Sequence, residues 1–83
     1  MSISQPEVTE VAAVGVRFTE TMLYIALSDG REVGMPLKRY AFLANATPEQ
    51  LSHWELEPRG FAVYWPRLND GLEVAHLLSL SPL

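Results

Sequence analysis

The sequence predicts a single α+β domain, in which an antiparallel sheet carries helices packed mainly on one face. Apolar residues first recur at every second position, which is the period of a strand. The middle of the chain then changes to mixed helical spacings, and the alternation returns before a helical end. The predicted order is therefore β-β-β-α-β-β-α, and grouped strands and helices of this kind are typical of the α+β class.

Two short turns divide the first part of the chain into three strands. Apolar side chains alternate along three segments, residues 14–18, 23–27 and 33–35. Glu20-Thr21 forms the first turn. Asp29-Gly30 predicts a tight hairpin, because glycine accepts the positive φ that a primed turn requires. Pro36 has no N–H for a ladder, so we expect it to end the third strand or to lie at a sheet edge. These strands read as an antiparallel meander.

A short helix follows in the middle of the chain. Thr47 is a good N-cap, and Pro48 suits the first helical position, where its missing N–H costs nothing. We expect this helix to be short, because the segment "ELEPRG" interrupts it.

Strand signals return after this helix, and the chain then closes with a second helix. The alternation covers residues 54–57 and 61–65, with a Pro-Arg-Gly turn between them. The tail "LNDGLEVAHLLSL" predicts a helix, since Asp70 and Glu73 have the spacing of a capping box. Apolar residues at helical spacing follow on one face.

The composition bounds the class of protein. Eighty-three residues make one domain, 1–83, whose residues 1–11 we interpret as a loose lead-in. The chain has no cysteine, no apolar run of membrane length, and no basic, apolar start typical of a secretory signal. We therefore expect a cytoplasmic protein. A net charge of −4 makes direct nucleic-acid binding a poor fit, because such binding needs many Lys and Arg side chains.

Three stretches resemble a family of small bacterial proteins, the domain of unknown function 2442. They are "LYIALSDGREVGMPL", "YAFLANATPEQLSHWEL" and "GFAVYWPRLNDGLEVAHLL". The resemblance covers residues 8–80, and its tail motif is the most specific part. Relatives often carry Asp after the Trp-Pro or His before the Trp, whereas Arg67 and Tyr64 stand at these positions here.

The resemblance implies a fold more than a function. Some longer relatives carry a helix-turn-helix domain after this one, and this chain ends before it. Others resemble the antitoxin half of a toxin–antitoxin pair, which implies a protein-binding role by analogy.

No motif predicts catalysis or a cofactor, and we expect neither. The two histidines, His53 and His76, are isolated in sequence, and no nucleotide-binding or zinc motif occurs. Glu55 and Glu57 lie on the same side of one strand, roughly 7 Å apart. A strand with one wet face gives the same pattern as a catalytic carboxylate pair, and the wet-face interpretation is favoured. An enzyme using either histidine with either glutamate remains a third hypothesis.

The face of the sheet that the helices leave open is the more informative feature. The alternation assigns the following residues to the helix-covered face: Val14, Val16, Phe18, Leu23, Ile25, Leu27, Val33, Met35, Leu56, Val63 and Trp65. It assigns these residues to the opposite face: Met22, Tyr24, Ala26, Ala62 and Tyr64. Met and Tyr are enriched at interfaces, whereas a wet face normally carries charge.

Two interpretations of this open face remain. Met22, Tyr24 and Tyr64, with Tyr24 beside Tyr64, form a candidate interaction face for a partner protein or for a second copy in a homodimer. Alternatively, the N-terminal segment or the last helix covers it. A function of a different class is a small-molecule or peptide sensor, with a candidate pocket between Trp54, Trp65 and the last helix.

Overall fold

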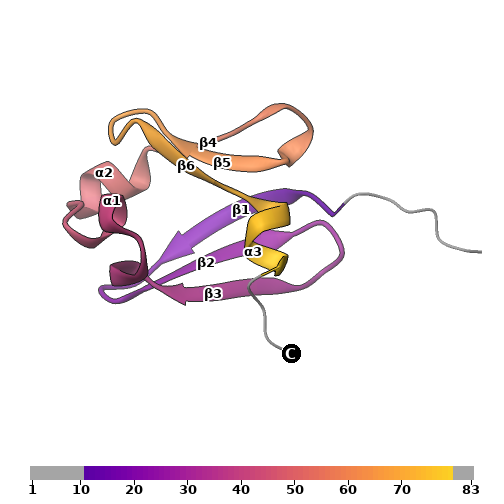
Figure 1. Cartoon of the computed structure of the whole chain (residues 1–83), viewed down its shortest axis with the longest axis horizontal. Helices are drawn as coiled ribbons and strands as arrows, with labels where there is room; N and C mark the ends of the chain where they lie inside the picture. Colours follow the sequence, from indigo (N-terminus) through magenta and orange to yellow (C-terminus); the bar gives the residue numbers. More distant parts are fainter. Residues whose placement is uncertain (1–10, 80–83) are drawn as a thin grey trace, which may run out of the picture.

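The structure, a computed structural model, describes residues 11–79, which form two three-stranded antiparallel sheets and several short helices (Figure 1). The α+β class is confirmed, and the order of elements agrees broadly with the predicted one. The lead-in expected at residues 1–11 falls, apart from Val11, outside the described residues.

Each sheet is a meander of three consecutive strands. The first sheet contains β1 (Ala13–Phe18), β2 (Met22–Leu27) and β3 (Glu32–Pro36) in that order. The second contains β4 (Glu55–Leu56), β5 (Ala62–Trp65) and β6 (Asp70–Glu73). The helices are α1 (Ala41–Ala44), α2 (Pro48–Ser52) and α3 (Val74–Ser79), with 3₁₀ turns η1 (Leu37–Arg39) and η2 (Pro58–Gly60).

The hairpin between β2 and β3 forms where Asp29-Gly30 predicts it. The Leu27 N–H donates to the Arg31 carbonyl at 2.8 Å, and the Gly30 N–H donates to the Leu27 carbonyl at 3.0 Å. Gly30 has a φ of +93°, and Asp29 does not share its positive φ. The loop therefore has three residues, with one left-handed glycine after an ordinary turn, and it is not the two-residue primed turn.

Pro36 lies at the position where a strand tolerates it. The Leu37 N–H donates to the Thr21 carbonyl, and the Arg31 carbonyl accepts from Leu27, so odd-numbered residues of β3 bond toward β2. The even-numbered residues Glu32, Gly34 and Pro36 consequently turn their backbone groups to the free edge. The missing proline N–H costs no ladder bond there, and the prediction for Pro36 is confirmed.

The start of α2 also agrees with the sequence. Thr47 Oγ1 accepts from the Gln50 N–H at 3.1 Å, and Gln50 Oε1 accepts from the Thr47 N–H at 2.9 Å, which completes a capping box. Pro48 occupies the first turn as expected.

The capping box predicted at Asp70 and Glu73 is wrong, because these residues form strand β6. Asn69 adopts φ +56° and its N–H donates to the Trp65 carbonyl at 2.8 Å, so residues 66–69 reverse the chain. Trp65 then pairs with Asp70 and Ala62 with Glu73, and α3 begins only at Val74. The turn residues produce a hairpin, and this overrides the capping pattern.

The strands also divide into two sheets where the sequence predicts one. In the described part of the chain, ladder bonds run only within each meander, and the helical segment 37–52 lies between the two meanders in the sequence. Gly60 packs directly on β1, since a Cβ there would lie 2.5 Å from the Ala13 carbonyl oxygen. The sheets therefore meet through packing.

The core fills the space between the sheets and helices. Its fully buried members come from both meanders and from α1, and they are Leu23, Ile25, Leu43, Val63 and Trp65. Two residues assigned to this face are instead exposed: Val14 at 55% and Leu56 at 40%. A register shift between Ala13 and Gly15 turns Ala13 inward in place of Val14, and Leu56 ends a two-residue strand. Ala62, assigned to the outer face, is buried.

Two of the strand glycines, Gly15 and Gly71, provide a matched test of the packing. In Gly71→Ala the new Cβ would lie 2.5 Å from the Val63 carbonyl oxygen, whereas in Gly15→Ala it would touch Ala26 at 4.0 Å. We expect Gly71→Ala to lower the free energy of unfolding by about 1–3 kcal/mol, and Gly15→Ala to change it little. Urea unfolding measures both values. Equal stability of the two variants would contradict the close approach of β6 to β5.

Candidate functional site

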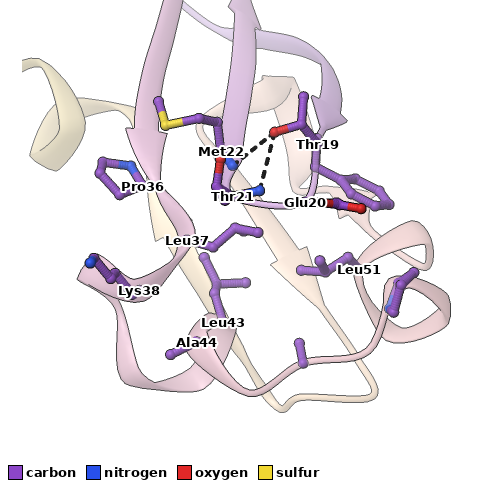
Figure 2. A pocket seen from close by; sticks show the side chains of 13 residues that line it. Thr19, Glu20, Thr21, Met22, Pro36, Leu37, Lys38, Leu43, Ala44 and Leu51 are labelled. Carbon is purple, nitrogen blue, oxygen red and sulfur yellow. Dashed lines mark hydrogen bonds between the residues drawn. The ribbon is translucent and has the colours of Figure 1, made fainter.

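An open cleft lies at one end of the first sheet, between the β1–β2 turn and the helical segment (Figure 2). We call it the apolar cleft. Its volume is about 450 Å³. The residues that line it are Phe18, Thr19, Glu20, Thr21, Met22, Pro36, Leu37, Lys38, Leu43, Ala44, Ala46, Pro48 and Leu51.

Few polar groups of the apolar cleft are free for a ligand. Thr19 Oγ1 accepts from the Thr21 N–H at 3.2 Å and from the Met22 N–H at 3.0 Å, which closes the β1–β2 turn (Figure 2). The charged side chains that line the cleft are Glu20 and Lys38. The lining therefore fits apolar groups better than a polar metabolite, which needs convergent hydrogen-bonding groups.

The candidate interaction face is divided between the two sheets. Met22 and Tyr24 lie on β2 and Tyr64 on β5, so the expectation that the tyrosines lie side by side on one sheet is wrong. The cause is the division into two meanders described above. All three side chains are half-buried, and Met22 lines the apolar cleft.

Each tyrosine covers a glycine that lies directly opposite it on an edge strand. Tyr24 pairs with Gly34, and a Cβ there would lie 2.8 Å from the tyrosine ring. Tyr64 pairs with Gly71, where a Cβ would lie 3.3 Å from the ring. Tyr64 also donates its hydroxyl to Asn69 Oδ1 at 2.9 Å. Both rings therefore fill space that a glycine leaves open on an edge strand.

An ion pair holds the Tyr24 ring from its other side. The Arg17 guanidinium lies 4.0 Å over the ring centroid. It donates two hydrogen bonds to Glu32, from Nε at 3.0 Å and from Nη2 at 2.9 Å. These bonds hold the pKa of the Glu32 carboxyl below its ordinary value of 4.5.

The candidate pocket beside the tryptophans is closed by packing. Trp65 is 0% exposed, and its indole N–H donates to the Leu51 carbonyl at 3.0 Å. Phe42 packs edge-on against it, with the ring centroids 5.8 Å apart. Trp54 packs, half-buried, against the core. A ligand beside Trp65 would have to displace core side chains.

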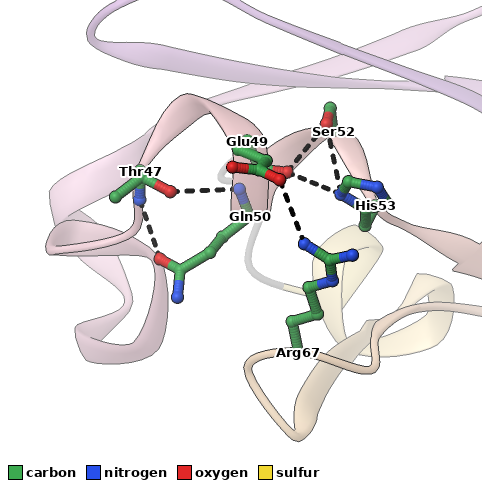
Figure 3. A network of polar contacts seen from close by, with 6 residues as sticks. All are labelled: Thr47, Glu49, Gln50, Ser52, His53 and Arg67. Atoms are coloured by element: carbon green, nitrogen blue, oxygen red, sulfur yellow. Dashed lines mark hydrogen bonds and ion pairs between the residues drawn. The ribbon is translucent and has the colours of Figure 1, made fainter.

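His53 belongs to a network that closes the end of α2 (Figure 3). Its Nδ1 donates to the Glu49 carbonyl at 2.8 Å, and Ser52 Oγ donates to the same oxygen at 2.7 Å. Glu49 Oε2 pairs with Arg67 Nη1 at 3.3 Å, which ties the 66–69 turn to the helix. Because Nδ1 is used as a donor, it is not available as a base for Ser52.

Among the described residues, the structure shows no contact of either histidine with Glu55 of β4 or with Glu57, which follows β4. His53 contacts Glu49, and His76 lies in α3 beside β6. Glu55 pairs across the strands with Tyr64, so it shares that residue's face of the second sheet. Within residues 11–79, no group of three His, Cys, Asp or Glu side chains is placed to hold a metal ion.

A second hollow lies along the free edge of β6, and the sequence does not predict it. We call it the β6 groove. Its volume is about 500 Å³, and it is lined by Tyr40, Ala41, Phe42, Asp70, Gly71, Leu72, Glu73 and His76. The hydroxyl of Tyr40 is buried and has no hydrogen-bond partner among the described residues. The sequence signal for this groove is Asn69, because asparagine tolerates the left-handed conformation that ends the 66–69 turn and lets residues 70–73 form a strand.

The fold defines the chain as a small α+β domain built from two antiparallel meanders. The chain belongs to the DUF2442 family, described as a protein of unknown function, which matches residues 13–82. This confirms the resemblance found in the sequence. No curated protein matches the chain.

Two solved structures are similar to this chain. One is a protein of unknown function from Rhodospirillum rubrum, with a TM-score of 0.75 and 22% identity over 86% of this chain and 88% of that one. The other is an uncharacterised protein from Chromobacterium violaceum, with a TM-score of 0.73 and 26% identity, covering 82% of this chain and 64% of that one. The first likeness shows the fold alone. Within the described residues, no helix has the length and apolar character needed to cross a membrane.

Tyr40→Phe tests the unpartnered hydroxyl. Removing a buried hydroxyl that makes no hydrogen bond should leave the free energy of unfolding unchanged or raise it by up to about 1 kcal/mol. Tyr64→Phe is the matched control, because it removes a bond to Asn69 and should cost about 0.5–1.5 kcal/mol. Chemical denaturation compares the two. A larger loss in Tyr40→Phe would show that its hydroxyl is bonded.

The Arg17–Glu32 pair predicts a pH dependence. Since the folded-state pKa of Glu32 is lowered, the pair stabilises the fold fully above the ordinary value of 4.5. This contribution is lost as the pH falls through the folded-state pKa. We expect the stability difference between wild type and Glu32→Gln to be constant above about pH 5.5 and to shrink below about pH 4.5. A difference that does not change down to about pH 3 would contradict the pair.

Proposed function

We propose that this protein is a cytoplasmic, non-enzymatic interaction module that binds another protein or a second copy of itself. This role is of the kind implied for the antitoxin-like or regulatory members of its family. The observation that carries the proposal is the apolar cleft, which is open to solvent and is lined in part by Met22. Open apolar surface of this kind is typical of protein contacts.

The chemistry of the apolar cleft supports a protein partner. Aliphatic and aromatic side chains form most of its lining, and the hydroxyl of Thr19 is already used in the turn. Interfaces are dominated by a few apolar side chains that enter such hollows and lose their water there. Met22 is adaptable in shape, which suits a surface that accepts a partner side chain.

Met22→Lys is the direct test. A lysine at the cleft places a charge where an apolar partner group would be buried, so binding should weaken about tenfold or more. Co-purification with the products of neighbouring genes, together with light-scattering mass, measures a partner and self-association. The partner's affinity is then compared between wild type and variant by titration.

Val14→Lys is the matched control for this experiment. Val14 is exposed and lies on the neighbouring strand outside the cleft lining, so the same substitution there should leave binding unchanged. Tyr24→Lys and Tyr64→Lys test the other two residues of the candidate interaction face in the same assay. The proposal would be overturned if Met22→Lys bound the partner as tightly as wild type does. It would also be overturned if the wild-type protein were a monomer that co-purified with no product of a neighbouring gene.

A small-molecule sensor is the second candidate, and the volume of the apolar cleft favours it. About 450 Å³ falls within the range of small-molecule sites. A ligand that binds only the native state raises the unfolding temperature. Stabilisation by a fraction of cell metabolites, abolished in Met22→Lys, would favour the sensor over the interaction module.

A further inference from the structure

The second sheet carries most of the unpaired negative charge of the described residues. Of the eight acidic residues in 11–79, three take part in ion pairs: Asp29, Glu32 and Glu49. Five remain: Glu20, Glu55, Glu57, Asp70 and Glu73. All but Glu20 belong to β4, β6 or the residue after β4. This sheet consequently attracts a positively charged group, with Glu55, Glu57 and Glu73 near Tyr64.

The edge of β6 is open for pairing. The Val74 N–H donates to the Phe61 carbonyl, so Leu72 and Asp70 also bond toward β5, and Gly71 and Glu73 turn their N–H groups to the free edge. Among the described residues, the Gly71 N–H donates only to the neighbouring Asp70 Oδ1, at 2.8 Å. An incoming carbonyl that replaces this carboxylate would free Asp70 to pair with a cation.

The β6 groove provides space beside this edge. Its opposite wall is formed by Tyr40, Ala41 and Phe42, and its volume is about 500 Å³. A strand laid against β6 would place alternate side chains toward this wall and toward the acidic face around Glu73. The hydroxyl of Tyr40, a residue of this wall, is buried and has no partner among residues 11–79.

The corresponding edge of the first sheet is protected in a way that β6 is not. The free edge of β3 presents Pro36, which has no N–H, and Glu32, which is already paired with Arg17. Proline on an edge is a common device against strand pairing, whereas unpaired carboxylates on an edge disfavour an added strand unless that strand is basic. At the β6 edge, the described residues include a glycine and two unpaired carboxylates.

We propose that an extended, basic segment of a partner protein adds as a further strand to the free edge of β6. Its lysine or arginine side chains lie over Glu73 on the outer face, and its apolar side chains lie on the face of Leu72 and contact Tyr40 and Phe42, while Asp70 adds negative charge at the start of the same edge. Strand addition supplies affinity through backbone hydrogen bonds and specificity through alternate side chains. This inference rests on the proposed function and names the chemistry of the partner.

Synthetic peptides on the intact chain test this inference. The probe alternates lysine with valine over eight positions, and a matched peptide carries glutamate in place of lysine. We expect amide shifts of Gly71 and Glu73 in NMR spectra with the lysine peptide only, and a Kd that rises with ionic strength. Asp70→Asn combined with Glu73→Gln should weaken binding about three- to tenfold.

N-methylated peptides separate strand addition from plain charge attraction. Methyl groups on the amides of the edge that faces β6 should abolish binding, and the same groups on the other edge should leave it intact. The inference would be overturned if the two N-methylated peptides bound equally well, or if the amide shifts in the NMR spectra lay away from β6. Tyr40→Phe is the control for the opposite wall of the β6 groove. It retains the ring and removes only the hydroxyl, so it should bind the lysine peptide as wild type does.

Met22→Lys separates a failure here from a failure of the proposed function. This variant leaves the β6 groove unaltered, so it should bind the lysine peptide as wild type does. A natural partner lost in Met22→Lys but retained in the Asp70→Asn, Glu73→Gln variant would leave the interaction module standing and refute strand addition. Light scattering with and without peptide identifies binding that only reflects self-association.

Discussion

The buried indole of Trp65 is the contact on which the arrangement of this protein depends. Its ring has no exposed surface, and its N–H donates to the Leu51 carbonyl across a span of 14 residues. Leu51 lies in α2 and Phe42, which packs edge-on against the ring, lies in α1. One side chain therefore fixes the second sheet against the helical segment. A tryptophan is buried in this way only when its N–H finds a partner.

The glycines opposite Tyr24 and Tyr64 show a second constraint that both meanders share. In each sheet a tyrosine of the middle strand lies across a glycine of an edge strand. The glycine weakens its strand because it has no side chain to pack, and the ring replaces that lost contact. The two edges then diverge. Pro36 blunts β3, whereas Gly71 leaves a backbone N–H on β6 that only a neighbouring carboxylate holds.

The elements predicted correctly are those that a local signal controls. Period two, Asp29-Gly30, Pro36 and the Thr47 cap each act over a few residues, and the structure shows them all. The sequence does not predict strand β6, because Asp70 and Glu73 have the spacing of a helix cap, while the left-handed conformation of Asn69 that overrides this signal is visible only in the backbone. The exposure of Val14 results from the register shift between Ala13 and Gly15, and no residue type in this segment predicts that shift.

The candidate site was predictable only in part, for the same reason. Met22 and its sequence neighbours line one side of the apolar cleft, yet the other side comes from residues 36–38 and 43–51, which lie far from them in the sequence. The division into two sheets, which separates Tyr24 from Tyr64, follows from long-range packing at Gly60 and Trp65. Grooves between elements depend on such packing, so a sequence can name their residue types but not their assembly.

Because the chain is short, part of its apolar surface stays accessible, and binding at that surface would affect its stability. A domain of this size buries only roughly 60 to 65% of the surface of its unfolded chain, so apolar groups remain accessible. Part of this apolar surface lies in the apolar cleft, while most of the unpaired carboxylates of the described residues lie on the second sheet or directly after β4. Since a partner that binds only the folded chain stabilises it by mass action, occupation of either surface would raise stability.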